Sequence, residues 1–183
     1  TAGLEIASKL AKIEKGSLTS EQTHTMIARY GEALAKFRFA GNRKWEAIVI
    51  SSIGSSYSRL GNWSKAIELQ REAIEIQRSI GEDKDIVFLL TNLANTFLHN
   101  GEPQRSLEVL AEAADLATLR GDPYNESIVL GSIGKVHEDS VDVDRAMTFY
   151  TRSLERAEKS GQDLRVAIAL NSLGTVNTLK RAD

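Results

Sequence analysis

Residues 50–73 read ISSIGSSYSRLGNWSKAIELQREA, and this stretch decides the fold. Gly54 and five serines crowd into its first nine residues. Gly costs about 1 kcal/mol relative to Ala in a helix, and Ser competes for the backbone from turn conformations. The residues on either side are nevertheless strongly helical in pattern. The small residues therefore indicate a requirement for close packing or for binding at this place.

The same pattern recurs along the chain with a period of 40 residues. Four glycines mark the period: Gly41, Gly81, Gly121 and Gly161. Two columns stay apolar, namely Ile50, Leu90, Leu130 and Leu170, and Ile53, Leu93, Ile133 and Leu173. Three columns stay small, namely Gly54, Ala94, Gly134 and Gly174, then Ala66, Ser106 and Ala146, then Ala33, Ala73, Ala113 and Ser153. So many coincident columns indicate an internal repeat.

Each unit predicts two helices, because apolar residues recur at spacings of three and four rather than alternating. In the unit 82–121 we expect helices over about Lys84–His99 and Pro103–Arg120. Glycine after a helix supplies a left-handed residue, and Asp before Pro supplies the next N-cap, as at Asp122 and Pro123. The small residue in mid-helix, such as Gly54, is expected to let a neighbouring helix approach closely.

The repeated pattern resembles the tetratricopeptide repeat. It stands here as Ile50, Ile53, Gly54, Tyr57, Gly61, Ala66 and Ala73, and again as Leu90, Leu93, Ala94, Phe97, Gly101, Ser106 and Ala113. The resemblance covers essentially the whole chain. It implies an all-α fold, a right-handed superhelical solenoid of antiparallel helix pairs.

Three departures from the family pattern are visible. The period is 40 rather than the common value of about 34. The proline near the end of the second helix is missing, since Arg78, Thr118 and Glu158 stand there, and Val141 replaces glycine in the third turn. The longer unit is similar to repeats of kinesin light chains, of spindle-orientation scaffolds, and of bacterial signalling proteins that couple repeats to a caspase-like or nucleotide-switch domain.

The expected organisation is a single solenoid over residues 1–183. It comprises a degenerate repeat (1–41), three full repeats (42–81, 82–121 and 122–161) and a half repeat (162–183). In the first repeat we expect a divergent helix over Leu4–Lys15, an N-cap at Thr19 or Ser20, and a helix over Met26–Ala40.

The last predicted helix, Leu164–Lys180, has no successor to cover its apolar residues Val166, Leu170, Leu173 and Val176. Terminal units of a solenoid need a polar cap. The simplest interpretation is that the natural chain continues; the alternatives are a dimer contact or a frayed end.

Composition excludes several classes of function. With 23 basic and 25 acidic residues the chain lacks the basic excess that general nucleic-acid binding needs. It has no cysteine, hence no thiolate metal site, which fits a reducing compartment, so we expect a cytoplasmic protein. No apolar run approaches the length that spans a bilayer, so no membrane partner is expected.

In the family that this chain resembles, first-helix residues beside the small column face a concave groove. The predicted peptide-binding residues are Ser52, Ser55, Arg59, Asn92, Asn95, His99, Ser132, Lys135, Asn171 and Thr175. By register the same face also holds Ser51, Thr91, Gly131, Asp139 and Ser172. Hydroxyls and amides there offer donors and acceptors to the backbone of an extended ligand. The alternative is that the serines are merely tolerated between tightly packed helices.

Catalysis has little support in the sequence. Of the histidines His24, His99 and His137, the last falls in the column of Tyr57 and Phe97, which favours a packing role. No pair of histidines has metal-ligand spacing. We therefore expect no catalytic residue, no metal site, no cofactor and no enzymatic activity.

Two functional hypotheses remain. The first is an interaction module that binds a protein or peptide segment in its concave groove. The second is a sensor or regulatory arm of a larger signalling enzyme or nucleotide switch, in intramolecular contact with domains absent here. The sequence that follows Asp183 in the gene would discriminate between them.

Overall fold

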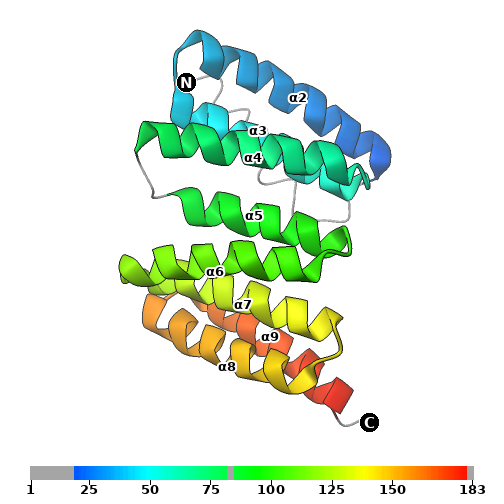
Figure 1. The fold of residues 1–183 in the computed structure, drawn as a ribbon, viewed down its shortest axis with the longest axis vertical. Helices are drawn as coiled ribbons and strands as arrows, with labels where there is room; N and C mark the ends of the chain where they lie inside the picture. Colours follow the sequence, from blue (N-terminus) through cyan, green and yellow to red (C-terminus); the bar gives the residue numbers. More distant parts are fainter. Residues whose placement is uncertain (1–18, 82–84, 181–183) are drawn as a thin grey trace. The chain divides into compact units, whose positions relative to one another are not determined.

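The computed structural model describes residues 19–81 and 85–180, which belong to two compact units, one ending at Asn100 and the other beginning at Gly101. Unit 1 contains α2 (Ser20–Phe39), α3 (Arg43–Arg59), α4 (Trp63–Ile80) and α5 (Ile86–His99) (Figure 1). Unit 2 contains α6 (Pro103–Leu119), α7 (Pro123–Asp139), α8 (Val143–Ser160) and α9 (Asp163–Lys180). These ranges contain no β-strand. The predicted all-α array of antiparallel helix pairs is confirmed, whereas the helix expected over Leu4–Lys15 lies outside the described residues.

Short turns join the helices, and several of them combine a left-handed glycine with a side-chain N-cap. Gly61 adopts a left-handed φ of 74°, and the side chain of Asn62 then accepts a hydrogen bond from the Lys65 N–H at 3.3 Å. At the start of α7, Asp122 accepts from the Asn125 N–H at 3.1 Å, and Pro123 occupies the first helical position. The helix start predicted at Asp122 and Pro123 is therefore confirmed, and Gly121 before it has the expected left-handed φ of 58°.

The first described helix begins before the predicted stretch Met26–Ala40, at one of the two predicted N-caps. The Thr19 hydroxyl oxygen accepts from the Gln22 N–H at 3.2 Å, and the Gln22 side chain accepts from the Thr19 N–H at 2.8 Å. This reciprocal capping box satisfies two backbone donors at once. It starts α2 at Ser20 instead of Met26, and of the two predicted N-caps it selects Thr19.

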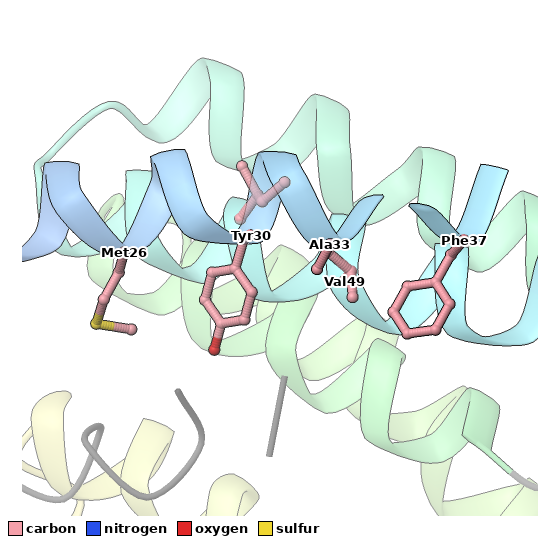
Figure 2. Packing of buried hydrophobic residues seen from close by; sticks show 6 residues of the cluster. Met26, Tyr30, Ala33, Phe37 and Val49 are labelled. Carbon is pink, nitrogen blue, oxygen red and sulfur yellow. The ribbon is translucent and has the colours of Figure 1, made fainter. Parts of the chain in front are cut away.

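The core of unit 1 includes the contact between α2 and α3. Figure 2 shows Met26, Tyr30, Ala33 and Phe37 on one side of α2, with Val49 of α3 among them. All five side chains are buried. Their spacing of three and four residues along α2 is the helical periodicity that the sequence displays.

Close helix approach occurs at Gly54 and Gly134 as predicted, whereas the prediction is wrong for Gly174, where a Cβ would meet nothing within 4 Å. A Cβ on Gly54 of α3 would lie 2.9 Å from Gln70 Cγ and 3.1 Å from the Ala66 carbonyl oxygen of α4. A Cβ on Gly134 of α7 would lie 2.7 Å from the ring of Tyr150 of α8. The distances of 2.9 Å and 2.7 Å are shorter than carbon atoms tolerate, so these two glycines allow the close approach of their helix pairs.

The last helix departs from expectation. Val176 is fully buried against Ala146 and Tyr150 of α8, and Leu173 packs beside it. Their cover comes from the preceding helix α8, whereas the expectation concerned a helix that follows α9. Leu170, which the repeat places in the apolar stripe, is instead 53% exposed. Leu164, Ile168 and Leu179 are exposed as well.

Replacing Gly134 with alanine should destabilise the protein by roughly 1–3 kcal/mol, because the new methyl group overpacks the contact with Tyr150. The Tyr150 ring is held in place, since its hydroxyl donates to Glu138 Oε2 at 2.5 Å. Gly174 occupies the same column in α9, and a Cβ there meets nothing within 4 Å. Gly174→Ala should therefore stabilise by up to about 1 kcal/mol through helix propensity. Urea denaturation of both variants measures the difference, and equal effects would contradict the assigned register.

Replacing Val141 with glycine should stabilise the protein by about 1 kcal/mol, because the left-handed conformation is strained for a β-branched residue. Val141 has a φ of 60° and is 78% exposed, so its removal sacrifices little packing. Thermal unfolding should show a rise of about 2–4 °C. The reciprocal variant, Gly121→Val, introduces the same strain at a φ of 58° and should lower the melting temperature. A lower melting temperature for Val141→Gly would refute this account.

Candidate functional site

A pocket of about 280 Å³ lies in unit 1 between α3 and α5, and we call it the α3–α5 pocket. It is lined by Ser52, Ser55, Ser58, Arg59, Phe88, Asn92, Asn95, Thr96 and His99. All six groove residues predicted within unit 1 are among them. The structure therefore brings these six side chains together, and their binding of a peptide stays a prediction.

The repeat explains why these side chains meet. Ser52, Ser55 and Arg59 lie at positions i, i+3 and i+7 of α3, which share one face of a helix. Their counterparts 40 residues later occupy the same face of α5. Because α4 reverses the chain between them, α3 and α5 run parallel and contact each other directly. Equivalent faces of successive repeats are thereby placed side by side.

Two residues expected on this face are buried instead. Ser51 is completely inaccessible, and its Oγ accepts a hydrogen bond from Asn92 Nδ2 at 3.2 Å. Thr91 is 5% exposed and donates to the Val87 carbonyl at 2.7 Å. Each directly precedes a residue that lines the pocket, Ser52 or Asn92. Successive residues of an α-helix are about 100° apart around its axis. That rotation turns both toward the helix contacts, so packing rather than binding accounts for Ser51.

The pocket retains hydrogen-bonding capacity. The Ser52 hydroxyl donates to the Ile48 carbonyl at 3.0 Å, and the Thr96 hydroxyl donates to the Asn92 carbonyl at 3.2 Å. Both oxygens keep lone pairs as acceptors. Within residues 19–81 and 85–180, the carboxamide of Asn95 forms no hydrogen bond. This amide presents both donors and an acceptor to anything that enters.

Basic side chains line one end of the pocket. Arg59 and His99 end α3 and α5, respectively, and both are exposed. The His99 ring stacks on Trp63 of α4, with 6.3 Å between ring centroids and 11° between planes. No lining residue is a carboxylate. A cation at the last turn also complements the helix dipole, so this placement has a structural benefit independent of any ligand.

The sequence prediction missed three lining residues, Ser58, Phe88 and Thr96. Phe88 lies four positions before Asn92 on α5 and is 49% exposed. The available signal was this i, i+4 spacing, which places Phe88 on the same face as Asn92. An apolar residue type favours the core instead, so only the structure identifies Phe88 as part of the pocket.

The remaining predicted groove residues lie on α7 and α9, which contact each other within unit 2. Lys135 pairs with Asp139 at 2.8 Å and with Glu138 at 3.0 Å. Its hydrogen bond to Asp139, assisted by Glu138, raises the pKa of Lys135 above its ordinary value. Ser132 is half-buried, and Asn171 is exposed, with its carbonyl accepting from the Thr175 hydroxyl at 3.1 Å.

His137 has the packing role that its column predicts. Its ring stacks on Phe149, with centroids 5.4 Å apart and planes 10° apart. Among the described residues, no group of three His, Cys, Asp or Glu side chains is placed to hold a metal ion. None of the described helices is both long enough and apolar enough to cross a membrane.

Comparison with family models identifies the repeats. Two models, both described as tetratricopeptide repeat, match residues 47–83 and residues 89–124. No curated protein matches the chain significantly.

Solved structures with the same fold include two Rap proteins. The apo form of RapI matches at 16% identity with a TM-score of 0.67, over 96% of this chain and 54% of that one. A Rap protein complexed with competence and sporulation factor matches at 14% identity with a TM-score of 0.76, again over 96% of this chain and 54% of that one. This chain thus spans about half the length of each Rap protein. At such low identity the similarity shows a shared fold alone.

A third match is to part of a larger ATPase. It is a signal transduction ATPase with numerous domains from Pyrococcus horikoshii, which has a tetratricopeptide repeat sensor. The match has 15% identity and a TM-score of 0.71, and it covers 88% of this chain and 25% of that protein.

Proposed function

We propose that this chain, which carries tetratricopeptide repeats at residues 47–83 and 89–124, binds a short extended peptide segment in the α3–α5 pocket. The observation that carries the proposal is the hydrogen-bonding capacity of Asn92 and Asn95 on one face of α5, turned into a pocket between two parallel helices. A peptide in an extended conformation exposes both N–H and C=O groups. A carboxamide side chain can donate a hydrogen bond to the C=O and accept one from the N–H.

The size of the pocket supports a small ligand segment. A volume of about 280 Å³ is near the lower limit of typical ligand sites, roughly 300–1,000 Å³. It has room for a few residues of an extended chain and not for a folded domain. Uncharged polar residues predominate in its lining, which suits recognition of a backbone.

The site extends by analogy to unit 2. Ser132, Lys135, Asn171 and Thr175 are proposed as the corresponding ligand-binding residues on α7 and α9. The Lys135 ammonium is shared between two carboxylates, so a ligand acid competes with Asp139 and Glu138 there. We propose that the chain acts by binding rather than by catalysis, since no carboxylate accompanies His99 in the lining of the α3–α5 pocket.

The second candidate function is a sensor arm in a larger signalling protein. It is favoured by the likeness to the repeat-containing ATPase, whose repeats are described as a sensor. Both candidates use the same pocket, and they differ in what binding then controls.

Replacing Asn92 and Asn95 together with alanine should weaken peptide binding by about tenfold, since each lost hydrogen bond contributes roughly 0.5–1.5 kcal/mol. The probes are heptapeptides selected on the wild-type chain from a random phage-displayed library, with affinities measured by calorimetry. Both asparagines are half-buried at the pocket and outside the apolar core, so the variant should keep its helical circular dichroism spectrum.

The matched control is the double variant Glu68→Ala and Glu75→Ala, whose side chains are exposed on α4. It should bind the selected peptides as the wild type does. If the α4 variant loses binding while the asparagine variant retains it, the binding site is on another surface. If the library yields no binder, the peptide-binding proposal fails.

A further inference from the structure

We infer that Phe88 determines the specificity of the α3–α5 pocket, by requiring a large apolar side chain in the peptide that binds there. This inference rests on the proposed function and names the class of ligand that it takes: an extended segment whose backbone meets Asn92 and Asn95 and whose aromatic or large aliphatic side chain covers the Phe88 ring.

A single exposed apolar side chain is ordinary on a protein surface, so exposure alone does not suffice. Phe88 is distinguished by its position, because it lines a pocket whose other walls are polar. Its neighbour on the same face, Asn92, lies one helical turn further along α5. A ligand that reaches the amide groups therefore passes the exposed part of the ring.

The exposed part of the ring is large enough to influence affinity. Phe88 is 49% exposed, whereas Phe97, nine residues further along α5, is 2% exposed. Aromatic side chains dominate binding when they become fully buried in a contact that excludes water. A ligand side chain laid on Phe88 would complete its burial and remove water from the hydrogen bonds to Asn92.

The repeat adds a second, independent observation. Phe88 belongs to a column of the 40-residue period that is apolar and not fully buried in the four units from residue 42 onward: Ile48, Phe88, Ile128 and Ile168. Core columns such as Ile50 and Leu90 are buried in the same helices. The column therefore keeps an apolar side chain at the edge of the polar face, and in the α3–α5 pocket that side chain is the largest of the set.

The two basic side chains of the pocket explain its ligand specificity less well than Phe88 does. Arg59 and His99 stand where two helices end, and each helix end carries about half an elementary negative charge. The two ends offset part of the attraction for an anion. The pocket is thus closer to neutral than its side chains suggest, which favours an apolar rather than an acidic ligand side chain.

The test is a double-mutant cycle between protein and peptide on the full chain. Heptapeptides selected from the random library on the wild type should share an aromatic or large aliphatic residue at one position. Replacing that residue with alanine should weaken binding to the wild type by at least about tenfold. The same peptide change should have little effect on binding to Phe88→Ala, because the partner ring is gone, and Phe88→Leu should restore part of the affinity.

Phe39→Ala is the matched control, since Phe39 is 96% exposed at the end of α2 and lies outside the pocket. It should bind the selected peptides as the wild type does. Two results would overturn this inference and leave the proposed function standing. The selected peptides could depend on Asn92 and Asn95 but share no apolar position. Alternatively, their apolar residue could contribute equally to binding by the wild type and by Phe88→Ala. An acidic consensus lost in Arg59→Ala would likewise overturn it. A library without binders would overturn both proposals.

Discussion

Paired helices of this protein approach each other most closely at glycines, and this close approach governs how the neighbouring residues pack. Gly54 meets the Ala66 carbonyl and Gln70 of α4, and Gly134 meets the Tyr150 ring of α8, at separations that leave no space for a methyl group. Glycine disfavours a helix interior, and only packing across the pair offsets that cost. The local sequence thus gives up helix propensity so that the two helices of a repeat can touch.

This constraint also shapes the pocket. Serines near Gly54 divide into two groups according to which side of α3 they occupy. Ser51 is buried in the contact with α5 and accepts a hydrogen bond from Asn92, which fixes that amide at the edge of the pocket. Ser52 and Ser55 face the pocket itself. One cluster of small residues therefore serves packing on one side and leaves room for a ligand on the other.

Most of the helices followed from the sequence because their signals are local. The glycine and N-cap turn at Gly61 and Asn62, and the Asp122–Pro123 start of α7, depend only on backbone geometry within a few residues. In α2 the apolar periodicity begins at Met26, whereas the capping box at Thr19 starts the helix at Ser20, nearly two turns earlier. Six residues of the α3–α5 pocket followed as well, because the period of 40 copies one helix face onto the next.

Residue spacing specifies the repeat, the helix pairs and the face on which polar residues gather, so these features can be predicted without coordinates. Which side chains each neighbouring helix covers depends on tertiary packing. It buried Ser51 and Thr91, exposed Leu170 while covering Val176, and left half of Phe88 in a polar pocket. A helix presents several faces, and the partners that cover each face are separated from it by tens of residues. Burial of a given side chain is therefore a property of the assembled helices, which no local pattern encodes.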